Sequence, residues 1–173
     1  MAQDTREQIV VAARELVAER GYEGTSFAAI AQRLGVTKAA VAYHFHPKET
    51  LLAALLTPAA RAVGALVARP APTSPTERRQ LALGYLDALL AHREVIAPLI
   101  TDPRLLASPA VGTRVATLRD EVRRRLTGPR EGDVATAWAV LGAVHIGVWR
   151  TLELDVDTVR PALVTAVARL LPD

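Results

Sequence analysis

Side chains that can hold an anion gather between Thr25 and Lys48. This window contains Arg33, Lys38 and Lys48, and it contains no aspartate or glutamate. Hydroxyl, phenol and imidazole groups lie among these cations, so the window can donate hydrogen bonds as well as carry positive charge. Such groups bind phosphate oxygens and base edges, and they do not break bonds by themselves. The window therefore predicts recognition of an anionic partner, although a lysine on a helix surface can also be simply solvated.

Two short helices joined by a tight turn would position these side chains. Thr25 or Ser26 can cap the first helix, and Gly35 can end it. Thr37 can cap the second helix, which Pro47 closes. The apolar positions of the inner faces are Phe27, Ile30, Ala31 and Leu34 in the first helix and Val41 and Phe45 in the second. This pattern is typical of a helix-turn-helix, whose second helix enters the major groove of DNA.

Further helices must hold this pair in place. The segment Thr5 to Arg20 predicts a first helix, whose apolar stripe closes a three-helix head. A fourth helix begins at Pro47 and runs to about Ala68. Pro58 interrupts it, because proline removes a backbone hydrogen bond inside a helix. We therefore expect a kink or break near Thr57.

The rest of the chain predicts a helical body. Arg69 to Pro75 is a loop by composition, and Ser74 and Glu77 form a capping box that starts a helix running to about Ala91. Prolines then divide the chain into short helical pieces. The later helices are expected from Ser108 to Gly128, from about Asp133 to Thr151, and from Asp157 to Leu171. No strand alternation is present, so we expect an all-α fold of about nine helices, with a three-helix head and a helical-bundle body.

The run from Gly21 to Leu52 resembles the DNA-binding domain of the tetracycline-repressor (TetR) family of bacterial regulators. The likeness rests on the unit Tyr43, His44 and Phe45, which stands at the family's spacing behind Gly35. The other positions that agree are Val36, Lys48 and Leu51. The resemblance implies that this region binds DNA. The residues expected to do so are Thr25, Ser26, Thr37, Lys38, Ala39, Ala42, Tyr43, His44 and Lys48.

Two positions depart from the family's pattern. Ala42 stands where many relatives have a tyrosine that touches phosphate, and Ala40 stands where they have a hydroxyl or small polar residue. Alanines can instead contact the methyl group of thymine. We therefore expect recognition to depend on Thr37, Lys38, apolar contact and the shape of the DNA.

The helix expected from Asp133 to Thr151 is apolar on all sides, which predicts that it is buried on more than one of them. The resemblance implies that this helix and the last one pair with their copies across a two-fold axis, as a four-helix bundle. The expected dimer interface comprises Val140, Val144, Gly147, Val159, Leu163, Val167 and Leu170. The alternative is that both faces of the helix lie in the core of a monomer.

A small, mostly apolar effector bound in the body is also implied by the resemblance. The sequence allows such a pocket, because apolar residues alternate with a few polar ones along the predicted body helices. The candidate lining residues are Tyr85, Leu89, His92, Ile96, Ile100, Trp138, His145 and Trp149. Each of them could instead be an ordinary core residue.

Composition limits the other classes of function. The chain has 173 residues and no cysteine, which excludes disulfides, thiolate chemistry and a cysteine-bound zinc. The start lacks the apolar core of a signal peptide, and the stretch Val134 to Trp149 is shorter than the roughly 20 residues of a membrane span. We expect a cytoplasmic protein that does not enter a membrane. No cofactor is expected, and no metal, because His44 and His46 do not share a helix face and no third ligand is near.

Together these features predict a homodimeric transcriptional regulator, acting as a repressor. Residues 1–46 would bind palindromic double-stranded DNA, and residues 47–173 would bind the effector and the second copy. The alternative is an effector-binding or protein-interaction dimer without sequence-specific DNA binding, suggested by Ala40, Ala42 and the balance of charges in Met1–Leu56. An enzyme is not expected, because no nucleophile elbow, phosphate-binding glycine loop or paired-carboxylate signature is present.

Overall fold

The computed structural model describes residues 2–172, with side chains from Thr5 onward. Every regular element in that range is a helix, which confirms the expected all-α class. There are eleven helices in the range, where about nine were expected, because the fourth is divided and the proline-rich segment forms two. They are α1 (Ala2–Arg20), α2 (Phe27–Leu34), α3 (Lys38–Phe45), α4 (Lys48–Leu55), α5 (Thr57–Val67), α6 (Pro75–Leu90), α7 (Arg93–Thr101), α8 (Pro103–Ala107), α9 (Gly112–Leu126), α10 (Asp133–Arg150) and α11 (Val156–Leu170).

The chain divides into two compact units. The first contains the residues up to Thr57 together with Glu94–Thr113, and the second contains Pro58–Arg93 together with the residues from Arg114 onward. This is a division by packing and not by function. The functional boundary after residue 46 therefore stays a prediction.

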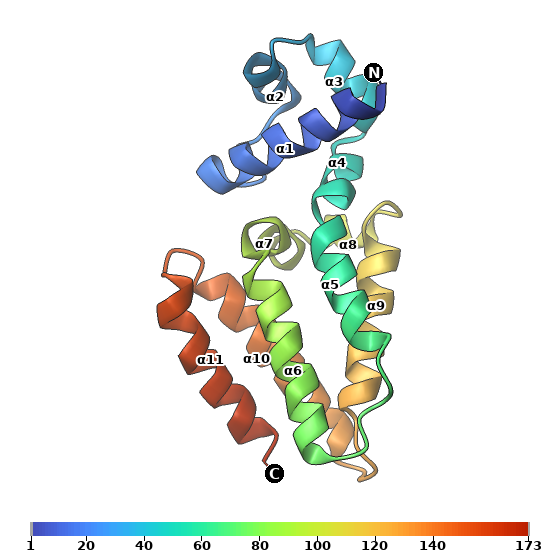
Figure 1. Cartoon of the computed structure of the whole chain (residues 1–173), viewed down its shortest axis with the longest axis vertical. Coiled ribbons are helices and arrows are strands. Elements are labelled where there is room, and N and C mark those ends of the chain that lie inside the picture. Colours follow the sequence, from blue (N-terminus) through green and yellow to red (C-terminus); the bar gives the residue numbers. More distant parts are fainter. Residues whose placement is uncertain (1, 173) are drawn as a thin grey trace. The chain divides into compact units, whose positions relative to one another are not determined.

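The first unit holds the expected three-helix head. In Figure 1, α1 lies across α2 and α4, and α3 packs against the same two helices. The side chains that meet at the centre are fully buried: Ile9, Leu16, Ile30, Val41, Phe45, Leu51 and Leu52. Burying one aliphatic or aromatic side chain contributes about 1.5–3 kcal/mol, so this cluster gives α3 a rigid support.

The expected break in the fourth helix is confirmed. α4 ends at Leu55 and α5 begins at Thr57. Pro58 lies in the first turn of α5, where its missing N–H removes no helical hydrogen bond. Among the described residues, no single helix is long and apolar enough to cross a membrane, and only α4 and α5 taken together across their break reach that length and hydropathy.

The second unit is built on α6, α10 and α11, which pack against one another (Figure 1). Leu86 of α6 and Leu141 of α10 are almost completely buried in its core. The capping box expected at the start of α6 is confirmed, with the Ser74 hydroxyl and the Glu77 carboxylate each bound to the other's backbone N–H. That box fixes where α6 begins and therefore how the preceding loop enters the unit.

Two helix starts differ from the expectation. α9 begins at Gly112 rather than Ser108, because the preceding residues form a turn in which the Gly112 N–H donates to the Ser108 carbonyl at 2.7 Å. The cap of α11 is Asp155 rather than Asp157, since Asp155 Oδ1 accepts from the Asp157 N–H at 2.8 Å. In both cases several neighbouring residues can begin a helix, so the local sequence alone did not determine which of them does.

Candidate nucleic-acid interface

The turn between α2 and α3 is set by its local residues. Ser26 caps α2, with its Oγ accepting from the Ala29 N–H at 3.1 Å. Gly35 ends α2 in the left-handed region, at φ 67°, and the Val36 N–H then bonds back to the Ala31 carbonyl. A side chain at Gly35 would cost about 1 kcal/mol or more in that conformation, so glycine is the favoured residue. The chain thereby reverses within a few residues and delivers α3 at a defined angle.

α3 has a buried face and a free face. The Thr37 Oγ1 accepts from the Ala40 N–H at 3.1 Å and caps the helix. Val41 and Phe45 are buried in the head, whereas Lys38 is exposed. The free face can therefore meet a partner without any rearrangement of the core, and an α-helix fits the major groove of B-DNA.

The aromatic unit at the end of α3, Tyr43 to Phe45, also has a buried side chain and an exposed one. Phe45 is 1% exposed and anchors the helix, and the Tyr43 ring is 86% exposed. The partly buried His44 ring lies edge-on to Tyr43, with 5.2 Å between the ring centroids. The exposed hydroxyl of Tyr43 can therefore donate to a phosphate oxygen.

Lys48 makes contacts within the head that the sequence did not suggest. Its Nζ donates to the Tyr22 carbonyl at 2.8 Å and lies 4.2 Å from the centroid of the Tyr22 ring. Burial lowers the pKa of Lys48, while Glu23 and Glu49 act in the opposite direction. The ammonium has three N–H donors and Tyr22 takes one of them. Lys48 therefore ties α4 to the loop after α1 and still has donors left for an anion.

Arg33 is neutralised by α1. Its Nη1 and Nη2 donate to the two carboxylate oxygens of Glu19 at 2.7 and 2.8 Å, and its Nη1 also lies 3.3 Å from Glu15. The hydrogen bonds that Arg33 donates to Glu19 lower the pKa of Glu19 and raise the pKa of Arg33. The acid-free window of the sequence is therefore not acid-free in space. Of its three cations, Lys38 and Lys48 are the two without a carboxylate partner among the described residues.

The other residues predicted to contact DNA differ in their exposure to solvent. Thr25 is 1% exposed and its hydroxyl donates to the Gly21 carbonyl at 2.8 Å, so this side chain serves the turn and is not free to meet DNA. Ser26 and Ala39 are exposed, and Ala42 is partly buried. Within residues 2–172 no three potential metal ligands lie close enough to hold an ion.

Two of the eight predicted pocket residues form a polar pair in the second unit. The Tyr85 hydroxyl and His145 Nε2 are 2.7 Å apart. Burial, with the charge of Arg119 adding to it, lowers the pKa of His145 to about 4, and burial raises the pKa of Tyr85. Trp138 instead lies at the surface, 47% exposed, with the guanidinium of Arg123 5.6 Å from its ring centroid. The remaining candidates are Leu89, His92 and Trp149 in the second unit and Ile96 and Ile100 in the first, and a pocket lined by these residues stays a prediction.

The residues predicted for the dimer interface lie mostly inside the protomer. The side chains of Val140, Val144, Val159 and Val167 are buried in its own core. Gly147 lies against Leu163, which lets α10 and α11 pack closely within one chain. Leu163 and Leu170 are partly buried. The exposed large apolar side chains of α10 are Val134, Trp138 and Ile146, at 44, 47 and 50%. The exposed apolar side chains of α10 therefore lie on the other face of the helix from the predicted residues, and the predicted interface stays a prediction.

Comparison with known proteins gives the head an identity. Residues 9–55 match the family model described as "Bacterial regulatory proteins, tetR family". Residues 9–55 are therefore a TetR-family domain. Over 55 residues the chain is 46% identical to the HTH-type transcriptional regulator TtgR of Pseudomonas putida, a match that covers 32% of the chain and 26% of TtgR. The chain thus matches about a quarter of the length of its curated relatives.

Solved structures extend the likeness to the fold of the body. A transcriptional regulator from Aquifex aeolicus matches with a TM-score of 0.71 and 20% identity, over 96% of this chain and 99% of that one. NalD of Pseudomonas aeruginosa, described as the secondary repressor of the MexAB-OprM multidrug efflux pump, matches with a TM-score of 0.68 and 23% identity, over 98% and 96%. A TetR/AcrR-family regulator from Thermobifida fusca matches with a TM-score of 0.65 and 26% identity, over 95% and 96%. The chain therefore shares the fold of these regulators over nearly all of its length.

Proposed function

We propose that this chain is a homodimeric repressor that binds palindromic operator DNA and is released from it by a small effector. One observation carries the proposal: α3 is anchored by Val41 and Phe45 while Lys38 and Tyr43 on its other side are exposed. A helix held this way can enter the major groove as a rigid body.

The proposed contacts divide into two kinds. Thr37, Lys38 and Ala39, at the amino end of α3, would face the base edges, where Ala39 can contact a thymine methyl and Ala42 can do the same one turn on. Tyr43, His44, Lys48 and Ser26 would contact the phosphate backbone, since their donors lie at the ends of α2, α3 and α4. Thr25 has no part in these contacts, because its hydroxyl is buried.

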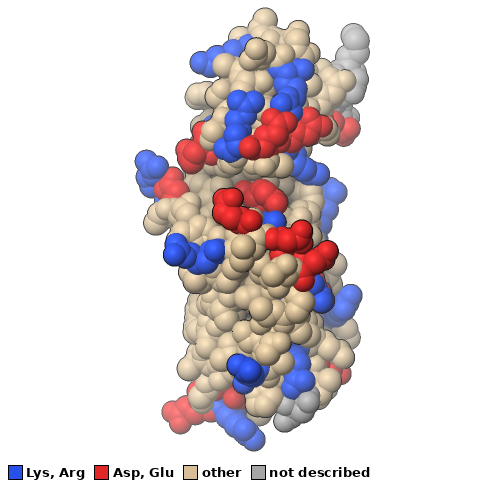
Figure 2. All heavy atoms as spheres, turned by 90° about the vertical axis from the view of Figure 1, so that its left-hand side faces the viewer, with Lys and Arg blue, Asp and Glu red and all other residues tan. Residues whose placement is uncertain are grey.

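The proposed dimer uses the exposed stripe of α10. Val134, Trp138, Gly142 and Ile146 follow one another at intervals of four residues and are all exposed. Small exposed residues on α11, Ala162 and Thr165, permit a second helix to approach closely. Figure 2 shows the side that carries α11, where uncharged side chains cover most of the surface of the second unit. Exposed apolar side chains gathered on one face are typical of an association surface.

Dimerisation supplies what one recognition helix lacks. A single short helix buries too little surface for tight, specific binding, whereas two of them about 34–36 Å apart read both halves of a palindrome. An effector would act by binding better to one spacing of the two heads than to the other, because a ligand with equal affinity for both shifts nothing.

A second candidate function has its own support. The pairing of Arg33 with Glu19 removes one cation from the head, and Ala40 and Ala42 leave α3 with few hydrogen-bonding side chains. Both features favour an effector-binding or protein-interaction dimer without sequence-specific DNA binding.

Selection of bound fragments from random duplex DNA separates the two functions. We expect enrichment of a symmetric site by the full chain. Lys38→Met should weaken binding to that site and lower the slope of log affinity against log salt by about one. Arg61→Met, which removes an exposed cation from α5, should leave both unchanged. Recovery of unrelated fragments, with equal affinity for scrambled sites, would reject the repressor in favour of the second candidate.

The oligomeric state tests the interface separately. Sedimentation velocity should give a dimer for the wild type and a monomer for Ile146→Glu, because the substitution puts an unpaired charge into the stripe, at its most exposed large apolar side chain. Ala65→Glu, at an exposed position of α5, is the matched control and should remain a dimer. A wild type that sediments as a monomer, or an Ile146→Glu variant that remains a dimer, would reject this interface.

A further inference from the structure

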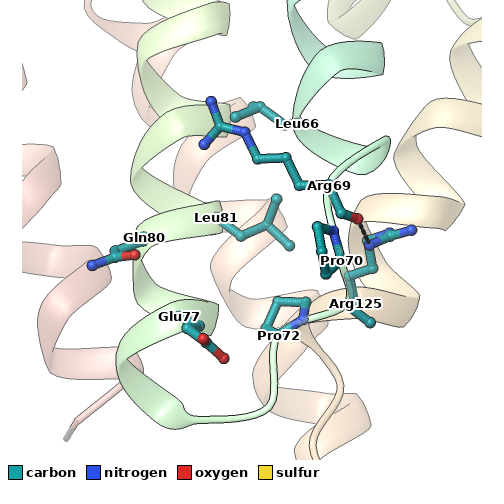
Figure 3. A pocket seen from close by; sticks show the side chains of 9 residues that line it. Leu66, Arg69, Pro70, Pro72, Glu77, Gln80, Leu81 and Arg125 are labelled. Carbon is teal, nitrogen blue, oxygen red and sulfur yellow. Dashed lines mark hydrogen bonds between the residues drawn. The ribbon is translucent and has the colours of Figure 1, made fainter.

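The second unit contains a cavity that includes none of the predicted pocket residues. It has a volume of about 230 Å³ and lies where the loop between α5 and α6 faces α9 (Figure 3). Its apolar walls are formed by Leu66, Pro70, Pro72 and Leu81. Arg69 and Arg125 also line it. The cavity therefore joins an apolar surface to two cationic side chains.

The wall of the cavity is held in place before any ligand arrives. Arg125 Nη1 donates to the Arg69 carbonyl at 2.8 Å and ties the loop to α9, while Arg125 Nε donates to Glu121 at 2.7 Å. The dashed line in Figure 3 marks the first of these bonds. The loop also contains Pro70 and Pro72, whose rings restrict the backbone. A site that is ordered beforehand loses less conformational entropy on binding.

Of the two arginines at the cavity, Arg125 is paired with Glu121 and Arg69 is not paired with a carboxylate among the described residues. Arg125 Nη2 takes no part in the bonds given above. Glu77, the acid of the lining, accepts from Thr73 and Ser74 at the start of α6. Those bonds lower the pKa of Glu77, and Figure 3 shows its carboxylate at the opposite end of the site from the Arg69 guanidinium.

We propose that this cavity binds a small organic monocarboxylate, whose carboxylate pairs with Arg69 and whose apolar body lies against Leu66, Pro70 and Leu81. A guanidinium presents two parallel N–H donors to a carboxylate, which makes such a pair stronger than a neutral hydrogen bond. The volume is below the roughly 300–1,000 Å³ of sites for drug-sized molecules, so a ligand of about ten non-hydrogen atoms is the right size. Naming this ligand as the effector rests on the proposed function, whereas its binding does not.

Direct titration of the full chain tests the site. Hexanoate and benzoate are the probes, and hexanamide and benzamide are their uncharged counterparts, followed by calorimetry or by chemical shifts. We expect saturable binding of the carboxylates and about tenfold weaker binding of the amides, which is the effect of losing one charge-assisted contact near the surface. Arg69→Gln should weaken carboxylate binding by a similar factor. Arg61→Gln, an exposed arginine of α5 outside the lining, is the matched control and should change nothing.

Three results would overturn the proposal. The first is equal binding of amides and carboxylates, and the second is undiminished carboxylate binding by Arg69→Gln. The third is a dissociation constant above about 10 mM for both acids, because the arginine contact would then contribute too little free energy to define a binding site. Ala71 also lines the cavity. Ala71→Phe, which fills the cavity without removing charge, should abolish binding, and unchanged affinity would contradict the location.

The two proposals fail in different ways. Titration without DNA reports on the cavity alone, and fragment selection without ligand reports on the repressor alone. Carboxylate binding by a chain that selects no DNA would support the binding site and reject its role as an effector site. DNA selection by a chain that binds no carboxylate would overturn the cavity and leave the proposed repressor intact.

Discussion

Replacing His145 by glutamine should make the body less sensitive to acid. His145 of α10 accepts or donates the hydrogen bond to the Tyr85 hydroxyl at 2.7 Å, and its ring is largely removed from water. That burial, with the charge of Arg119 adding to it, lowers the pKa of the imidazole to about 4. An amide at this position can keep the bond to Tyr85 but cannot take up a proton.

The sign of the effect follows from the two pKa values. In the unfolded chain the imidazole titrates near 6.5, and in the folded chain near 4. Between these values the unfolded state binds the extra proton, so stability falls as the pH falls and stops falling below about 4. The separation of the two pKa values corresponds to about 3 kcal/mol in full, of which about 2–3 kcal/mol should be lost between pH 7.5 and 4.5.

Urea unfolding followed by tryptophan fluorescence measures this quantity. The two tryptophans of the chain, Trp138 and Trp149, both lie on α10, so the signal reports on the helix that carries His145. The free energy of unfolding of the wild type should fall by about 2–3 kcal/mol more than that of His145→Gln between pH 7.5 and 4.5, at one protomer concentration. Comparing the two proteins removes the contribution of the carboxylates they share.

A control lies at higher pH. Between about pH 7.5 and 9 the imidazole is neutral in both states, so the two proteins should respond alike. Equal acid sensitivity of wild type and variant, within about 0.5 kcal/mol, would show that the His145 pair is not desolvated in solution and would refute the reasoning.

Two further predictions concern the head. Gly35→Ala should lower the free energy of unfolding of the head by about 1 kcal/mol, because the residue has a φ of 67°. Amide hydrogen exchange of α2 and α3 measures this loss, and unchanged protection would contradict the left-handed turn. Lys48→Met should lower the salt slope of DNA binding by about one, since the donors that Tyr22 leaves free would no longer reach phosphate. The same variant should also destabilise the head by about 1 kcal/mol through the lost bond to the Tyr22 carbonyl, and an unaltered salt slope would assign Lys48 a structural role only.

The helix-turn-helix could be predicted from the sequence because its determinants are local. Ser26, Gly35 and Thr37 act on backbone groups within four residues of themselves, and the inner face of α3 follows from the spacing of Val41 and Phe45. Helix caps and apolar periodicity operate at this range, so their outcome does not depend on the rest of the chain. The break at the start of α5 was predictable for the same reason, since Pro58 acts on its own turn.

What the sequence could not decide depended on residues far apart in the chain. Arg33 appeared as a free cation until the fold brought Glu19 of α1 to it. α10 is apolar on all sides, so its periodicity could not tell which face meets α11 and which, with Ile146, stays exposed. By itself the sequence determined that the chain is all-helical and where its recognition helix begins, because these follow from contacts within a few residues. Only the tertiary structure decided which charges remain free and which apolar face remains uncovered, because both are set by partners many residues away.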